Sequence, residues 1–434
     1  MMTRRTMLAR LALGTAGLTC GAVALRQSQG ASTLPSALAP QDDKFLEEIA
    51  QASFRMFWEN AHPGTGLVRN VATRSDAEKN EVSSIAATGF GLTALCLGAE
   101  RGWVRSEAAR DRARRTLRFL QEEIPHQNGF YFHFVNWANG QRVWQCEVSS
   151  IDTAILLCGV LTARQYFADT EIQSRATQIF DRVDWQWLYR EGPFLLHGWT
   201  PEHGLLKARW DTYCEHMMLY LLAIGANAHA IPAASWDAWR RPGLKYGDLQ
   251  YIDDATPLFV HQYSHAWFDF QNRRDAYADY FANSVLATRA HRRFCEELAE
   301  EFPDYSRELW GITASESPHG YAVWGGPPRL GPIDGTVVPC AAGGSLPFLT
   351  AECLVTLRTM RERFGARIWS PLGFADAFNP ASGWVAPNRI AINTGITLLM
   401  AENARTRFVW NTFMKNPEVQ SGMARVGLLP AGPV

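Results

Sequence analysis

The sequence has no surplus of charge of either sign. Its 42 Lys and Arg residues balance 43 Asp and Glu residues, so the formal net charge of the 434-residue chain is −1. Binding to the phosphate backbone of nucleic acid requires a basic surface, and this composition argues against one. We therefore expect no nucleic-acid partner, and a neutral ligand agrees better with the charge balance.

The cysteines lack the spacing of a zinc site. The chain has eight of them, and no two form a Cys-x-x-Cys pair. Apart from Cys20, most lie in apolar segments that resemble helices, which favours buried free thiols over disulfides. We expect no metal and no other cofactor.

The chain beyond its N-terminus lacks an apolar run long enough to span a membrane, which takes about eighteen residues. At the N-terminus, Arg4 and Arg5 precede a mildly apolar Gly/Ala-rich run of signal-peptide length, as in a twin-arginine export signal. We expect residues 1–35 to be this signal and a short linker. The mature protein is then a soluble periplasmic monomer. Lipidation of Cys20 is an alternative, although the residues before it fit that pattern poorly.

One pentapeptide occurs twice and indicates a repeated unit. Glu-Val-Ser-Ser-Ile stands at 81–85 and at 147–151, and an apolar segment follows each copy. A further step of the same length reaches 211–226, which is also apolar and also carries carboxylates at its start. Charge-rich amphipathic segments such as 106–124 and 171–183 alternate with these apolar ones. The alternation predicts inner helices surrounded by outer helices.

The repeat length predicts the fold class. Roughly 390 mature residues divided by a unit of about 65 residues gives about six helical hairpins. No Ser-, Gly- or Pro-rich linker divides the chain, so we predict a single all-α domain over 40–430, an (α/α)6 barrel or toroid. Its later inner helices are expected at 256–270, 344–357 and 391–403.

Four long connections are rich in Gly, Pro and aromatic residues, and each leads towards the start of an inner helix. They are 125–144, 191–210, 311–340 and 371–388. Long loops in a compact domain are usually functional. We expect them to gather at one end of the barrel and to form the active site there.

Several carboxylates stand at the predicted starts of inner helices, where they would converge on one cavity. Asp211 and Glu215 are four residues apart and would share one helix face. An ionised carboxylate beside a protonated one is the pair that glycoside hydrolysis requires. Capping by Asp211 with an exposed Glu215 is an equally weighted alternative. Asp152 also has a capping alternative, because Ser149–Asp152 forms a capping box, whereas Glu147 is a candidate for substrate contact.

Aromatic and polar side chains of the loops suit a carbohydrate. Of the sixteen tryptophans, Trp144, Trp210 and Trp384 are candidates for stacking on pyranose rings, since flat apolar rings match the C–H faces of sugars. His261 and Gln262, near another predicted helix start, are candidates for binding sugar hydroxyls.

A metal-binding face is one interpretation of the segment 261–270. His261, His265 and Asp269 are spaced by four residues and would share one side of a helix. A polar stripe that lines a cavity is the favoured interpretation.

Several ordered motifs resemble one family, the glycoamylase-like domain of glycoside hydrolase family 144. They are SIDTA at 150–154, DWQWLY at 184–189, GWTPEHG at 198–204, HQYSHAWFDF at 261–270, WGITAS at 310–315, DGTVVPCAAGGSLPF at 334–348, GFADAFN at 373–379 and ENARTRFVW at 402–410. The resemblance implies an (α/α)6 toroid and an endo-β-1,2-glucanase that inverts the anomeric configuration.

The resemblance also implies roles for individual residues. Glu215 matches the family's general acid, and Glu147 matches a glutamate of the substrate site. Asp376 is the first choice for the carboxylate that activates water, and Asp211 is the second. The chain departs from the family pattern at Asn393, where an aspartate is expected.

The function expected from the sequence is that of an exported hydrolase that cleaves β-1,2-glucan internally and releases sophoro-oligosaccharides. An exo-acting relative that releases sophorose or glucose is one alternative, which a site closed at one end by the 311–340 loop would favour. A non-catalytic glucan-binding protein is the other alternative, and it requires Glu215 to be dispensable.

Overall fold

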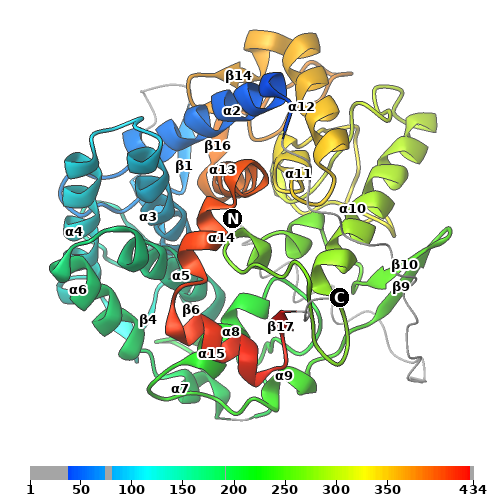
Figure 1. The fold of residues 1–434 in the computed structure, drawn as a ribbon. Coiled ribbons are helices and arrows are strands. Elements are labelled where there is room, and N and C mark those ends of the chain that lie inside the picture. The colour runs from blue at the N-terminus through cyan, green and yellow to red at the C-terminus, as the bar shows by residue number, and fades with distance from the viewer. Residues whose placement is uncertain (1–37, 74–80, 191, 431–434) are drawn as a thin grey trace.

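The computed structural model describes residues 38–73, 81–190 and 192–430. The export signal expected at 1–35 lies outside the described residues. The protein is mainly helical, as predicted, and its helices surround a common centre, while its strands have only two to four residues (Figure 1). No helix in the described ranges is both long and apolar enough to cross a membrane.

The inner helices are apolar nearly all round because their sequences carry few charges. In α3 (Ile85–Glu100), every residue from Ile85 to Gly98 is buried, and α5 (Ser150–Tyr166) is buried from Ser150 to Arg164. Two glycines let these helices touch. A Cβ at Gly89 would lie 2.4 Å from the carbonyl oxygen of Ile155, and one at Gly159 would lie 2.0 Å from that of Gly89. Only glycine allows this backbone contact.

The outer helices each keep a solvated face, which confirms the amphipathic prediction. They are α2 (Pro40–Glu59), α4 (Ser106–Glu122), α6 (Thr170–Asp181), α10 (Tyr280–Glu297) and α12 (Thr350–Phe364). In α4, the buried Ala109, Ala113, Leu117 and Leu120 recur at helical spacing. The segment 344–357, predicted as inner, instead contributes to the outer helix α12, because Arg358–Arg363 continue it with a charged face.

Two predicted inner helices differ from expectation. The segment 256–270 forms two 3₁₀ turns, η2 (Leu258–His261) and η3 (Ser264–Ala266). Helix α8 begins only at Met217 and ends at Gly225. A side chain from another segment provides a hydrogen bond that a regular helix would form within its own backbone. Ser264 Oγ accepts from the backbone N–H of Met218 at 3.0 Å.

The inner elements form a closed succession. Helix α3 packs on α5, α5 on α8, α11 (Pro339–Gly343) on α13 (Ala391–Thr406), and α13 on α3. Ser264 joins η3 to α8. Gln262 joins η2 to α11, since its amide donates to the carbonyl of Ala341 at 2.9 Å. The order is therefore α3, α5, α8, η2 and η3, α11, α13 and back to α3.

Short strands connect the starts of neighbouring inner helices along one rim. The pairs are β16 (Asn388–Ile390) with β1 (Val71–Thr73), β2 (Val82–Ser84) with β5 (Phe134–Asn136), and β6 (Val148–Ser149) with β7 (Gly198–Thr200). Because β16, β2 and β6 directly precede α13, α3 and α5, these pairings place the loops before those helices side by side.

The opposite end of the ring is covered by two helices. Helix α14 (Phe408–Phe413) packs on α5 and α13, and α15 (Pro417–Arg425) packs on α8; both are red in Figure 1. A buried ion pair fixes α15, since Arg164 Nη2 of α5 lies 2.6 Å from Glu418 Oε2. One hydrophobic cluster runs from Phe45 to Leu428. The seven cysteines of the described chain are buried and form no disulfide with one another, as predicted.

Candidate active site

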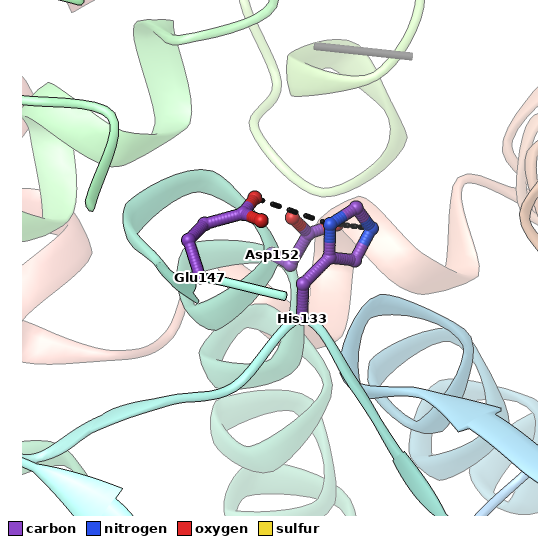
Figure 2. A group of neighbouring side chains, drawn as sticks. All are labelled: His133, Glu147 and Asp152. Atoms are coloured by element: carbon purple, nitrogen blue, oxygen red, sulfur yellow. Dashed lines mark hydrogen bonds and ion pairs between the residues drawn. The ribbon is translucent and has the colours of Figure 1, made fainter. Parts of the chain in front are cut away.

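A histidine contacts two carboxylates at the start of α5 (Figure 2). His133 comes from the segment between β4 (Phe130–Tyr131) and β5, Glu147 directly precedes β6, and Asp152 is in the first turn of α5. Nδ1 of His133 is 3.2 Å from Glu147 Oε1, and Nε2 is 3.6 Å from Asp152 Oδ1. All three side chains belong to buried residues, so burial and mutual contact fix their geometry.

Ser149 has two functions beside this cluster. Its hydroxyl oxygen accepts from the backbone N–H of Asp152 at 3.1 Å, which caps α5 as the sequence predicts. The same hydroxyl donates to Asp152 Oδ2 at 2.5 Å. The carboxylate of Asp152 is therefore held between Ser149 and His133 rather than turned to solvent.

The cluster offers three potential metal ligands, one atom per residue, within 4.8 Å of one another. A metal ion would need one imidazole nitrogen and both carboxylates on the same side of the ring. Nδ1 of His133 faces Glu147 and Nε2 faces Asp152, and the two carboxylates lie next to each other beside the imidazole (Figure 2). His133 thus joins the two carboxylates in one polar cluster, whose nitrogen and oxygen donors are of the kind that a divalent ion binds.

Glu215 lies in the turn that precedes α8, where it is 4% exposed. The thiol of Cys214 donates to Glu215 Oε2. The hydroxyl of Ser264 donates to the backbone carbonyl of Glu215 at 2.8 Å, which fixes the turn against η3. Glu215 thus presents a buried carboxyl group at the start of α8, between the starts of α5 and η2.

The predicted helical pairing of Asp211 with Glu215 is wrong. Residues 211–216 are not helical, and Thr212 forms a β-bridge with Arg240. The carbonyl of Asp211 accepts from the N–H of Arg240, and the N–H of Tyr213 donates to the carbonyl of Arg240, both at 2.8 Å. Pairing with this distant segment holds the chain extended, so residues four apart do not share a helix face.

Asp376 is a second buried carboxyl group on the same rim, between the starts of α11 and α13. The backbone N–H of Glu316 donates to its Oδ2 at 2.8 Å, and Asn393 Nδ2 donates to its Oδ1 at 2.9 Å. Burial, with a smaller contribution from the neighbouring Glu316 carboxylate, raises the pKa of Asp376 to about 7, against the lowering effect of the two donors. This carboxyl group exchanges its proton near neutral pH.

A small cavity adjoins Asp376. Its volume is about 20 Å³, and its lining includes Asp376, Asn393, Thr397 and Cys340. A cavity of ~10–15 Å³ with polar walls is large enough for one water molecule. The structure therefore offers room for a water next to a carboxyl group that ionises near pH 7.

The three candidate tryptophans lie in different surroundings. Trp144 is 55% exposed and contacts Phe134 edge-on at 5.1 Å, while Phe134 stacks on His133 at 3.8 Å. Trp384 is half-buried in the loop before β16, where its backbone carbonyl accepts from the N–H of Asn379 at 2.8 Å. Trp210 is only 3% exposed, because its ring stacks on His197 and its indole N–H donates to Ser150. Trp144 and Trp384 present surface to a ligand, whereas Trp210 packs in the core.

His261 and Gln262 are also core residues. His261 is 1% exposed and pairs with the hydroxyl of Tyr213, with 3.1 Å between Nδ1 and Oη. The Gln262 amide donates to the carbonyl of Ala341 and, at 2.8 Å, to Ser345. Both side chains fix η2 within the protein, so neither offers hydrogen bonds at an open site.

The possible metal face of 261–270 is not formed. His265 Nε2 lies 3.0 Å from Ser284 Oγ, and Asp269 pairs with Arg407. Burial lowers the pKa of His265 to about 3. Because the segment forms 3₁₀ turns, these side chains point to separate partners. The predicted spacing of four residues along one face applies only to a regular α-helix.

Sequence reasoning missed two residues of the site, His133 and Glu316. Both lie in long aromatic- and Gly-rich connections that the sequence identified as functional, yet nothing in their immediate neighbours distinguishes them. Glu316 stands on β12 (Ser315–Ser317), and its carboxylate accepts from Asn388 Nδ2 at 2.5 Å. This contact fastens the hairpin of β12 and β13 (Gly320–Ala322) to the start of α13.

Residues 207–417, which include Glu215 and Asp376, match the glycoamylase family, described as "Putative glucoamylase". The resemblance found in the sequence motifs is thereby confirmed, and with it the prediction of a glycoside hydrolase.

Three relatives agree with this assignment. The chain is 28% identical, over 93% of its length, to an exo β-1,2-glucooligosaccharide sophorohydrolase of Parabacteroides distasonis, and it spans 60% of that protein. An endo-β-1,2-glucanase from Chitinophaga pinensis, solved with sophorotriose and glucose, has a TM-score of 0.83 at 26% identity and covers 91% of this chain and 99% of its own. A β-1,2-glucanase from Parabacteroides distasonis gives 0.83 at 27% identity, with 92% and 61% covered.

Proposed function

We propose that the protein hydrolyses β-1,2-glucan with inversion of configuration, with Glu215 as general acid and Asp376 as general base. The fold is taken as an (α/α)6 toroid with both carboxyl groups on one rim, Glu215 at the start of α8 and Asp376 between the starts of α11 and α13. Inverting enzymes place an acid on one face of the sugar and a base with its water on the other.

The observation that carries the proposal is the environment of Asp376. A general base must ionise near the working pH and must contact the water that it activates. The pKa of Asp376 is about 7, and a cavity of about 20 Å³ adjoins it. The donors from Glu316 and Asn393 hold both carboxyl oxygens in place, which orients the group before substrate binds.

The substrate class is supported by the relatives and by the rim. All three relatives are named for action on β-1,2-linked glucose. The exposed Trp144 ring is connected through Phe134 and His133 to Glu147 and Asp152. An apolar ring beside fixed carboxylates offers a sugar both stacking and hydrogen bonds.

Endo action is the first form of the proposal, and exo action is the second. The Chitinophaga pinensis structure supports the endo form. The exo form is supported by the sophorohydrolase and by the β12–β13 hairpin, which Glu316 and Asn388 fasten at the rim, where it would close one end of a cleft.

Incubation with linear β-1,2-glucan tests the proposal. Thin-layer chromatography at early times gives a ladder of sophoro-oligosaccharides for endo action and a single short product for exo action. Proton NMR during the first minutes shows the α-anomer forming first if configuration inverts. No cleavage of β-1,2-glucan, or a β-anomer as first product, would contradict the proposal.

Export to the periplasm is part of the proposal, and it rests on the Arg4-Arg5 segment alone. Fractionation of cells that express the full chain tests it. Replacement of both arginines by lysine is expected to retain the protein in the cytoplasm, and unchanged export would exclude the twin-arginine route.

A further inference from the structure

A second pocket lies at the opposite end of the ring from the candidate active site. It has a volume of about 500 Å³ and is bounded by the last turns of three inner helices and by α14. Glu100 ends α3, Tyr166 ends α5 and Thr406 ends α13, and Phe408 and Asn411 belong to α14. Figure 1 shows α14 beside α5 and α13. The volume is within the range of ~300–1,000 Å³ that small-molecule sites occupy.

Helix length separates this pocket from the rim. Asp152 and Tyr166 stand near the two ends of α5, and a rise of 1.5 Å per residue puts them about 21 Å apart along the axis. A monosaccharide or disaccharide bound in the pocket therefore does not reach the carboxylates of the rim. The pocket is a separate site.

Two aromatic rings form one wall of the pocket. Tyr166 and Phe408 are both partly exposed, and their ring centroids lie 5.6 Å apart with the planes at 69°. The rings thus meet nearly at right angles and leave apolar surface open to the pocket. The C–H face of a sugar ring stacks on such surface.

Polar groups line the rest of the pocket. Gln165 donates its amide to Asn416 at 3.0 Å, which fixes the side chain and leaves its carbonyl oxygen available as an acceptor. The Asn411 amide is exposed on α14 beside it. Amides offer donors and acceptors together, as the hydroxyl groups of a sugar require.

The charges around the pocket compensate one another. Arg101 is held by two contacts to the fully buried Glu402, including Nε to Oε2 at 3.0 Å. The remaining charges are Lys415 and Glu100, one of each sign. The ends of three helices add only partial negative charge. This balance disfavours a strongly charged ligand and favours a neutral, hydroxyl-rich one.

We propose that this pocket binds a short segment of a neutral glucan chain at a distance from the site of hydrolysis. The identity of the polymer as β-1,2-glucan rests on the proposed function, whereas the pocket's preference for a neutral saccharide rests on its own residues. A polymer held at both ends of the ring stays near the enzyme between cleavage events, which raises its effective concentration at the rim.

Affinity electrophoresis in gels that contain β-1,2-glucan tests the proposal. The parent is Glu215→Gln, which is expected not to digest the gel. Asn411→Arg fills the pocket without removing core packing, and Gln51→Arg, which adds the same charge at an exposed position of α2, is the matched control. Phe408→Ala removes the stacking wall in a second variant.

We expect Asn411→Arg and Phe408→Ala to weaken the retardation by glucan about fivefold relative to Gln51→Arg, the effect of losing one stacked sugar contact. With Glu215 intact, the kcat/KM of Asn411→Arg on the β-1,2-linked pentasaccharide of glucose should equal that of wild type, because the two sites are separate. Equal retardation of Asn411→Arg, Phe408→Ala and the control would overturn the pocket proposal. Failure of the wild type to cleave β-1,2-glucan would instead overturn the proposed function.

Discussion

Replacement of Asp376 by asparagine tests the electrostatics of the candidate base through protein stability. The pKa of Asp376 is about 7 in the folded protein, against 3.8 for an unperturbed aspartate. The folded state therefore binds this proton more tightly than the unfolded state. The stabilisation is complete below pH ~3.8 and is lost as the pH rises through about 7.

The loss amounts to ~4 kcal/mol in total, because each unit of pKa difference corresponds to ~1.4 kcal/mol, and ~3 kcal/mol of it falls between pH 5 and pH 8. The side-chain amide in Asp376→Asn does not ionise, so the variant lacks this loss. Its NH₂ group would face one of the donors from Glu316 and Asn393, at a cost of about 1–3 kcal/mol. That cost is the same at both pH values and cancels in the comparison.

Urea denaturation of wild type and Asp376→Asn at pH 5 and pH 8 measures the effect. Between pH 5 and pH 8, the free energy of unfolding of the variant should rise by ~3 kcal/mol relative to that of wild type. Asp248→Asn, at a side chain that is 85% exposed, is the control and should show no such gain. If Asp376→Asn and wild type change in parallel between the two pH values, Asp376 does not titrate near pH 7 and the assignment of the base loses its support.

Four further outcomes are expected. Glu215→Gln should lower kcat on β-1,2-glucan by about 10²–10⁴-fold with folding intact, as loss of a general acid does, and retention of most activity would move the acid elsewhere. Trp144→Ala should raise KM about threefold to tenfold with little change in kcat, since stacking is worth ~0.5–1.5 kcal/mol; an unchanged KM would exclude the ring from the substrate site. Exhaustive chelation should leave kcat unchanged, and a loss of activity that a divalent ion restores would make His133, Glu147 and Asp152 ligands. Asn393→Asp should shift the acidic limb of the kcat/KM profile to higher pH, because a second carboxylate beside Asp376 raises its pKa, and an unshifted limb would refute that coupling.

The inner and outer helices could be predicted because their causes are local. The repeated Glu-Val-Ser-Ser-Ile places Ser84 and Ser149 at the N-caps of α3 and α5, where their hydroxyls accept from the first turn. Continuous apolar sequence marks the buried helices, and spaced apolar residues mark the outer ones. These features depend on neighbours within four residues, which the sequence displays directly.

The start of α8 and the 3₁₀ turns could not be predicted in the same way. The backbone of Asp211–Tyr213 pairs with Arg240, and the side chain of Gln262 bonds to Ala341 and Ser345. These partners lie tens of residues away in the chain, so a helical pattern at 211–216 or 256–270 carries no trace of them. Tertiary hydrogen bonds outweigh helix propensities of under ~1 kcal/mol per residue.

The same distinction explains the candidate site. Motif resemblance selected Glu215 and Asp376 as individual residues, but the chemistry of Asp376 depends on Glu316, which is 60 positions away in sequence. Asn393 illustrates the difference between the sequence and the structure. The sequence shows it only as a missing carboxylate, whereas in the structure its amide donates to Asp376 and to the carbonyl of Ala314. An ionised aspartate at 393 would add a second negative charge beside a buried carboxyl group whose pKa is already about 7, so the amide keeps Asp376 able to ionise at neutral pH.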